Sequence, residues 1–355
     1  MVFKSLLVGV NYLKSNKYRL SSPINDVKIM KDFLINYCNV RESDLMILSD
    51  SPEYKQAASF FNIIKHIKLL ASELTSEDFL FMYFSGHGSS IPDSNNDEKD
   101  KKDEVFLPQD WQISYISDDL FNSLLKKFKC RICLVFDCCN SGTMCDLKYS
   151  YNVKDYTCTE YVKKDNTNMT DIVCFSSSGE NANSFEKFVD KNVINTDENK
   201  FYGEFTIFFL HILKGYLEDK LSFDELTYNE LIKLMNFYTN EFSSKEENDV
   251  IKTVLHNNIY SKNIKPYVNF SFNNIKNYTF FNSRTDDEKK RYENEGTINK
   301  LKKRSVNSLS YKLLRTHRKN EFLEKKIKVL TDKNKKLINV INKAAGKHAF
   351  NMVVR

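Results

Sequence analysis

The sequence predicts an α/β fold with a mainly parallel β-sheet and helices on both of its faces. Short runs of branched and aromatic residues alternate with longer segments of helical periodicity, which is typical of βαβ units. The 355 residues are 41% hydrophobic and 13% aromatic, which is enough apolar material for a full core. The length allows one main domain and a smaller extension.

Five runs have the length and composition of buried strands. They are residues 5–10, 44–48, 78–85, 131–136 and 172–175. A sixth β-like segment covers residues 265–272. We therefore expect a sheet of about six strands, in which the parallel strands are joined by helical crossovers.

Helical patterns lie between and after these strands. The expected helices are residues 25–37, 54–73, 118–128, 203–217 and 227–238. In the first two, apolar residues recur at helical spacing and predict a buried face. These residues are Val27, Met30, Phe33 and Leu34 in the first helix and Phe61, Ile64, Ile67 and Leu70 in the second.

Two polar stretches without periodicity, residues 92–103 and 148–170, read as surface loops. They divide the chain into a first region, 1–147, a polar linker, 148–170, and a second region, 171–283. The remaining residues, 284–355, form a tail in which hydrophobic residues recur at heptad spacing. This tail is either a coiled coil that self-associates or a solvated helix without a partner.

The net charge of +6 comes from the tail. Residues 284–355 contain 21 lysines and arginines against 8 acidic residues, so the rest of the chain carries about −7. A mildly acidic main region suits basic peptides and disfavours nucleic acid as its partner. The tail itself could instead dock on nucleic acid or an anionic membrane.

Several classes of protein are excluded by simple counts. The first 20 residues lack a secretory signal pattern, and no stretch reaches the roughly 18 apolar residues of a membrane span. Cysteines inside apolar runs favour a reducing compartment, so we expect a soluble, cytoplasmic protein. Cys130 and Cys133 form a C-x-x-C pair without the second ligand pair that a zinc site needs.

Two motifs follow expected strands, at the sheet edge where open α/β folds place function. Residues 83–88 read YFSGHG and set His87 between two glycines. Residues 136–143 read FDCCNSGT and present Cys139 after an apolar strand. A thiol is a strong nucleophile when a nearby imidazole takes its proton. The two residues are 52 positions apart, and they are the candidate catalytic pair.

Together these motifs resemble the p20 region of the metacaspases, caspase-like cysteine peptidases of protists, plants and fungi. The resemblance extends to LVGVNY at 7–12 and DEVFLPQD at 103–110, and it covers residues 3–180 well and residues up to 275 more weakly. It implies a caspase-like αβα sandwich with a p20-like part, 1–147, and a p10-like part, 171–283. No prodomain precedes the first expected strand, so the pattern is type I-like without that segment.

The resemblance implies a role for each matching residue. Cys139 is the nucleophile and His87 the base, with the backbone N–H groups of Gly88 and Cys139 as the oxyanion hole. An S1 pocket for Arg or Lys would be formed by Asp26, Ser85 and Asp137, because two carboxylates suit one guanidinium. Peptides and proteins cut after Arg or Lys are the implied substrates. From its position alone, Asp26 could instead cap a helix after Pro23.

The resemblance also implies activation by Ca²⁺ held beside the active site. The matching residues are Asp103, Asp118, Asp119 and Asp146, and Asp100 is an alternative to Asp103. Oxygen ligands of this kind suit a weak calcium site, although solvated surface acids would show the same pattern. Lys148, Lys154, Lys163 and Lys164 make the linker a candidate for self-cleavage.

Three positions depart from the family pattern. Asn140 replaces the usual His after the nucleophile, Cys138 replaces the usual Ser before it, and Pro23 stands where some relatives have Cys. Attack by Cys138 would break the D-x-C spacing. The departures leave open an inactive or weakly active scaffold that oligomerises through its tail.

Overall fold

The computed structural model describes residues 1–93, 100–155, 157–161, 169–179, 182–191, 198–220, 223, 226–241, 264–272 and 280. All of them fall within the first of two compact units, which covers Met1–Lys290. The tail, 284–355, with its expected heptad pattern, lies outside the described residues. No helix in the described ranges is long and apolar enough to cross a membrane.

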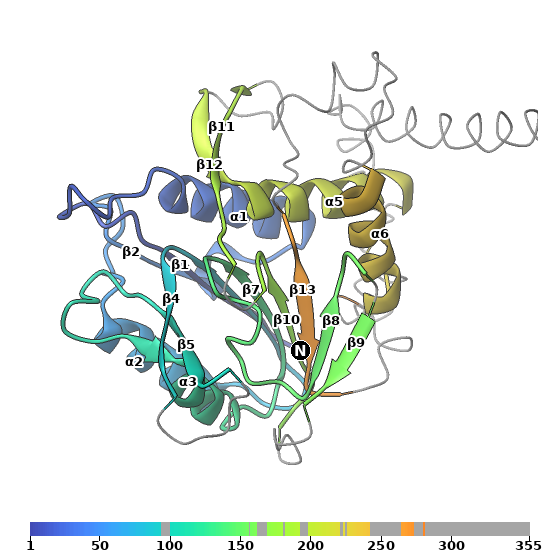
Figure 1. Cartoon of the computed structure of the whole chain (residues 1–355), viewed down its shortest axis with the longest axis horizontal. Helices are drawn as coiled ribbons and strands as arrows, with labels where there is room; N and C mark the ends of the chain where they lie inside the picture. The colour runs from blue at the N-terminus through green and yellow to red at the C-terminus, as the bar shows by residue number, and fades with distance from the viewer. Residues whose placement is uncertain are drawn as a thin grey trace, which may run out of the picture. The chain divides into compact units, whose positions relative to one another are not determined.

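An eight-stranded sheet forms the centre of the fold (Figure 1). Its strand order is β2 (Leu45–Ser49), β1 (Phe3–Gly9), β3 (Phe79–Ser85), β7 (Arg131–Asp137), β10 (Ile172–Ser176), β13 (Tyr267–Phe270), β8 (Tyr149–Asn152) and β9 (Thr157–Glu160). The first five are parallel, and the last three pair antiparallel. The predicted α/β fold with a mainly parallel sheet, of the caspase-like type, is confirmed.

Helices cover both faces of this sheet (Figure 1). One face carries α1 (Pro23–Tyr37), α5 (Glu204–Lys220) and α6 (Tyr228–Glu241). The other carries α2 (Phe60–Glu73) and α3 (Asp118–Leu125). Because successive side chains of a strand point to opposite faces, Leu6 and Val8 of β1 join the core under α2 and α3. Leu7 between them is also buried, on the opposite face.

The helix α2 starts six residues later than the predicted segment 54–73. Ser59 caps it by accepting a hydrogen bond from Asn62 N–H, and Gln56 forms a bridge with Leu48 instead of a helical turn. Phe61, which we predicted on the buried face, is 70% exposed, and Phe60 packs against the core instead. Three residues turn an α-helix through about 300°, which is about 60° less than a full turn. Side chains spaced three residues apart therefore point in gradually different directions, and not all of them can face the core.

The segment 148–170, predicted as a polar linker, contributes the strands β8 and β9. All four residues of β9 are exposed, because it is the last strand of the sheet. A polar edge strand gives no alternation of apolar residues, so its sequence looks like a loop.

Two smaller sheets complete the described part. One consists of β4 (Gly88–Pro92), β5 (Lys102–Phe106) and β6 (Ile116–Ser117). It uses both ends of the segment 92–103 that we predicted as a loop. The other is a hairpin of β11 (Glu186–Val189) and β12 (Lys200–Gly203), which stands beyond the layer of α1 and α5 (Figure 1).

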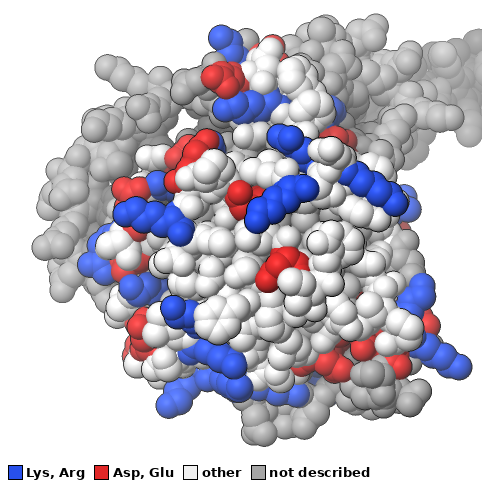
Figure 2. Space-filling view, turned by 90° about the vertical axis from the view of Figure 1, so that its left-hand side faces the viewer, with Lys and Arg blue, Asp and Glu red and all other residues white. Residues whose placement is uncertain are grey.

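Charged side chains of both signs are interspersed on the side of the molecule shown in Figure 2, around a broad uncharged area. A protein that binds nucleic acid typically carries a continuous basic stripe. The visible described surface is therefore unlike such a binding face.

Candidate active site

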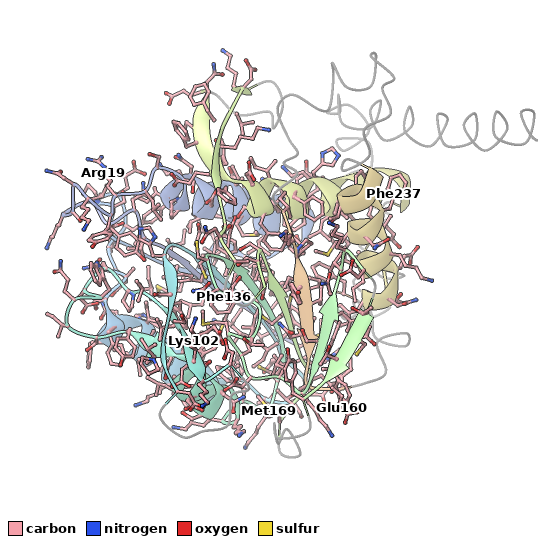
Figure 3. The ribbon with its side chains drawn as sticks, viewed as in Figure 1. Arg19, Lys102, Phe136, Glu160, Met169 and Phe237 are labelled. Atoms are coloured by element: carbon pink, nitrogen blue, oxygen red, sulfur yellow. The ribbon has the colours of Figure 1, made fainter. Side chains whose placement is uncertain are left out.

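The two residues predicted as a catalytic pair follow neighbouring strands. Strands β3 and β7 pair in parallel, and their register sets Ser85 opposite Asp137. His87 and Cys139 each come two residues after these partners. Gly86 N–H donates to the Asp137 carbonyl at 3.4 Å, so the two loops stay together beyond the strand ends. Phe136 in Figure 3 marks the carboxyl end of β7 in the middle of the molecule.

The loop after β1 orients the imidazole of His87. Its Nε2 lies 2.8 Å from the carbonyl oxygen of Tyr18, the residue before Arg19 in Figure 3. A carbonyl only accepts, so Nε2 carries the proton and Nδ1 of the neutral ring keeps its lone pair. The ring also packs against Tyr12, with centroids 4.6 Å apart. Nδ1 is therefore the nitrogen that can act as a base.

Cys139 and its neighbour Cys138 lie in different environments. Cys138 is 1% exposed, and burial raises its pKa well above the usual range. Cys139 is half-buried, and its Sγ accepts from Ser184 N–H at 3.3 Å. Burial also raises the pKa of Cys139, and the Ser184 N–H opposes that shift. The Cys139 thiol is therefore protonated at neutral pH, and attack requires a base.

Gly88 lies directly against the backbone of Cys139. A Cβ added to Gly88 would lie 1.9 Å from the Cys139 carbonyl oxygen and 3.1 Å from Cys138 Sγ. Only glycine fits at this distance, so the two predicted oxyanion-hole residues belong to one closely packed backbone unit. Asn140 has a φ of 53°, in a region that Asn tolerates better than most residues, and its N–H donates to Ala182 O at 2.9 Å.

The carboxylate of Asp26, in the first turn of α1, is fully buried. It accepts from Ser85 Oγ at 2.9 Å and from Gly203 N–H at 2.8 Å. Ser85 and Gly203 lie outside α1, and a third partner, the Ser22 hydroxyl, belongs to the N-cap residue of α1. Burial, followed by repulsion from Asp137, raises the pKa of Asp26 well above its usual range.

Asp137, the last residue of β7, faces Asp26 across Gly203. A Cβ at Gly203 would lie 2.2 Å from Asp137 Oδ2 and 3.0 Å from Asp26 Oδ2. Asp137 accepts from Ser184 Oγ and from Thr206 N–H and Oγ1, the last two at 2.9 and 2.7 Å. Its exposure is 5% and that of Asp26 is 0%, so a cationic side chain has to displace one of these donors to reach either carboxylate.

Residues 4–148 match the family model "Metacaspase, peptidase C14 domain". The chain is 35% identical to Metacaspase-1 of Candida glabrata over 156 residues, which are 42% of this chain and 40% of that protein. It is 34% identical to Metacaspase-1B of Aspergillus fumigatus over 158 residues, 42% of this chain and 38% of that protein. Residues 4–148 are therefore similar in sequence to the metacaspase peptidase domain. The match spans about two fifths of the length of these relatives.

Among solved structures, a protein from Geobacter sulfurreducens aligns with a TM-score of 0.46 and 18% identity, over 81% of this chain and 96% of its own. A likeness at this level carries no argument about function.

An acidic cluster joins β5 and α3. Oxygen atoms of Asp103 on β5 and of Asp118 and Asp119 on α3 lie within 4.8 Å of one another. Asp118 accepts from the N–H groups of Glu104 and Asp119, both at 2.8 Å. Burial, together with repulsion from Glu104 and Asp103, raises the pKa of Asp118 to about 8 against these hydrogen bonds. A cation would relieve that repulsion, so the donor set fits a divalent metal.

Asp146, the expected fourth ligand, is not among the three clustered carboxylates. It is buried, and Asn122 Nδ2 on α3 donates to the Asp146 carbonyl at 3.4 Å. Asp100, the alternative to Asp103, is exposed and accepts from Lys102 N–H at 3.2 Å, outside the cluster.

Sequence reasoning missed four residues that contact the candidate site. The Tyr18 carbonyl and the Ser184 N–H act through their backbone, so no side-chain pattern could mark them. Thr206 lies in the expected helix 203–217, for which the sequence predicted no polar contact with the site. The hydroxyl of Tyr12 accepts from His87 N–H at 2.8 Å and donates to Leu107 O at 2.6 Å. Tyr12 ends the LVGVNY motif, which is the one signal that could have drawn attention to it.

Proposed function

We propose that the protein is a cysteine endopeptidase that uses Cys139 and His87. The observation that carries the proposal is the β3–β7 register, which sets Ser85 opposite Asp137 and so brings the loop of His87 beside that of Cys139. The similarity of residues 4–148 to the metacaspase domain supports the same chemistry.

The proposed reaction uses the nitrogen that the structure leaves available. His87 Nδ1 takes the thiol proton as Cys139 Sγ bonds to the substrate carbonyl carbon, and the carbonyl oxygen becomes an oxyanion. The N–H groups of Gly88 and Cys139 would stabilise that charge. His87 then gives the proton to the departing amine as the C–N bond breaks, which leaves a thioester. Water, losing a proton to His87, hydrolyses the thioester and restores the thiol.

We propose that Arg or Lys on the N-terminal side of the cut is recognised above Asp26, Ser85 and Asp137. The two carboxylates share a buried space, in which burial and then repulsion from Asp137 raise the pKa of Asp26. A guanidinium would offset that repulsion by supplying positive charge. Because Ser184 and Gly203 now donate to these carboxylates, binding of the cation requires the strand ends that carry them to shift.

Calcium is the proposed activator, held by Asp103, Asp118 and Asp119. When bound, it would supply a fixed positive charge between β5 and α3. Thr143 Oγ1 donates to Glu104 Oε2 at 2.7 Å, and this contact joins the cluster to the loop that follows Cys139. Ordering of that loop is how the cation would act on the nucleophile. Asp146 belongs to the same loop and could approach as a fourth ligand.

Self-cleavage in the segment 148–170 is also proposed. Lys148 forms an ion pair with Glu160 at 3.1 Å, and the Lys154 carbonyl accepts from Asn236 Nδ2 at 2.9 Å. Both lysines are therefore held by the fold and would have to be released before cleavage. Lys163 and Lys164 lie outside the described residues.

The test uses the full chain, with and without millimolar calcium, on peptides that carry Arg, Lys or Asp at the cleaved position. Calcium-stimulated turnover of the Arg and Lys peptides, lost in Cys139→Ala, is expected. Peptide hydrolysis that persists in Cys139→Ala would contradict the proposal.

A second candidate is a scaffold that lacks turnover. It is favoured by one observation, the enclosure of Asp26 and Asp137 by the protein's own donors. A folded wild-type chain that binds calcium and cleaves none of the peptides would support this candidate.

A further inference from the structure

The base of the hairpin β11–β12 contacts Cys139 and the proposed S1 carboxylates. Ser184, two residues before β11, touches both Cys139 Sγ and the Asp137 carboxylate. At the other strand end, Gly203 N–H donates to Asp26. The two ends of the hairpin therefore hold the nucleophile and the proposed S1 carboxylates.

Glu186, the first residue of β11, also connects the hairpin to the N-terminus of α1. Its Oε1 accepts from Ser21 N–H at 2.8 Å and from Ser22 N–H at 2.7 Å. Ser22 is the N-cap of α1, and its side chain makes no capping hydrogen bond. The Glu186 carboxylate thus satisfies backbone donors at a helix N-terminus, where negative charge is favourable.

The segment whose backbone N–H groups Glu186 accepts from also contains Tyr18, which contacts His87. Tyr18, whose carbonyl fixes the Nε2 proton of His87, precedes Ser21 by three residues in the same loop. A second tie between the same elements is the hydrogen bond from Asn25 Nδ2 to Phe201 O, at 2.9 Å. The loop that orients the imidazole is therefore joined, through β11 and β12, to the segment that contacts the thiol.

We propose that Glu186 is a positioning residue that sets the orientation of the His87 imidazole relative to Cys139. The proposal rests on the cysteine peptidase function above. Glu186 acts as a hydrogen-bond acceptor for two backbone N–H groups, and its role does not depend on contact with substrate. A glutamine at this position keeps an oxygen acceptor, whereas alanine removes it.

The test compares Glu186→Gln and Glu186→Ala with Glu198→Ala, which removes an exposed carboxylate from the same segment of the chain. Hydrolysis of an Arg peptide is measured together with alkylation of Cys139 by iodoacetamide between pH 5 and 9. For Glu186→Ala we expect kcat to fall at least about tenfold with KM within about twofold, because an interaction made in the transition state is lost. Part of the Cys139 alkylation rate depends on His87 and is removed from the wild type by His87→Ala. The same part should be missing in Glu186→Ala.

Glu186→Gln should stay within about threefold of the wild type in both measurements, and Glu198→Ala should match the wild type. Glutamine as damaging as alanine would overturn the proposal in favour of a role for the charge. A loss confined to KM would overturn it in favour of substrate recognition. Thermal unfolding of each variant shows whether it is folded, and Glu186→Leu, which also lacks the oxygen acceptor, replaces the alanine variant if that variant is not. The proposed function itself would be contradicted if the wild-type chain showed no turnover and if His87→Ala left the rate of Cys139 alkylation unchanged.

Discussion

Ser85 and Asp137 lie opposite each other at the carboxyl ends of two neighbouring parallel strands. Each is followed two residues later by one member of the proposed catalytic pair. Because a parallel register fixes the relative height of two strands, the loops that carry His87 and Cys139 leave the sheet at the same level. The pairing of these two residues, one a hydroxyl and one a carboxylate, also forms the floor of the proposed cation pocket.

Replacement of Cys138 should have far less effect than replacement of Cys139. Cys138 is fully buried and its raised pKa makes it a poor nucleophile, whereas the Cys139 sulfur is half-exposed beside Ser184. We expect Cys139→Ala to lose activity completely and Cys138→Ala to keep it within about tenfold, the reduction coming from altered packing. Peptide hydrolysis by the two variants at equal folded concentration measures this. Equal loss in both would contradict the assignment of the nucleophile.

A side chain at position 88 should abolish turnover. The added Cβ of Gly88→Ala meets the Cys139 carbonyl oxygen at 1.9 Å, and a backbone atom cannot move away as the end of a flexible side chain can. We expect kcat to fall by about 100-fold or more, the scale seen when an oxyanion hole is disturbed. Ser89→Ala, at the exposed next position, is the matched control and should match the wild type.

Tyr12→Phe should weaken both the fold and the orientation of His87. The hydroxyl accepts from His87 N–H and donates to Leu107 O, and the side chain is 3% exposed. Removing it leaves both partners without that bond, so the free energy of unfolding should drop by about 1–3 kcal/mol. Denaturant unfolding of this variant and of Tyr115→Phe, an exposed control, checks the expectation. A Tyr12→Phe protein as stable as the control would show that these bonds contribute nothing.

Calcium binding should strengthen as the pH rises toward about 8. Asp118 holds a proton below its pKa of about 8, and a bound cation would displace that proton. Its pKa is higher in the folded than in the unfolded chain, so the calcium-free protein should lose stability as the pH rises from about 4 to 8. Calcium should restore that stability. Titration calorimetry in buffers of different ionisation enthalpy measures the released proton, and affinity independent of pH would contradict the assignment.

The sequence predicted the parts of the fold that depend on apolar periodicity. The five parallel strands and α1 followed from such patterns, and the faces of α1 at Val27, Met30, Phe33 and Leu34 are buried as expected. The prediction that Phe61 is buried was wrong because the start of α2 is set by the cap at Ser59, which periodicity does not reveal. The strands β8 and β9 were missed because polar edge strands lack the apolar alternation.

The candidate site also has a part that the sequence predicts and a part that only the structure shows. His87, Cys139, Asp26 and Asp137 follow from side-chain motifs, and the structure places them at one sheet edge. The backbone groups of Tyr18 and Ser184 depend on the path of two loops, which no single-sequence pattern encodes. The contact from Glu186 to the N-terminus of α1 joins residues more than 160 positions apart, so it appears only once the chain is folded.

The central claim, that His87 draws the proton from Cys139, is tested most directly by labelling with an arginyl chloromethyl ketone followed by mass spectrometry of the peptides. We predict one adduct, on Cys139, formed at least about 100-fold more slowly in His87→Ala because the thiol then lacks its base. An adduct on Cys138, or labelling of Cys139 at an unchanged rate in His87→Ala, would contradict the account.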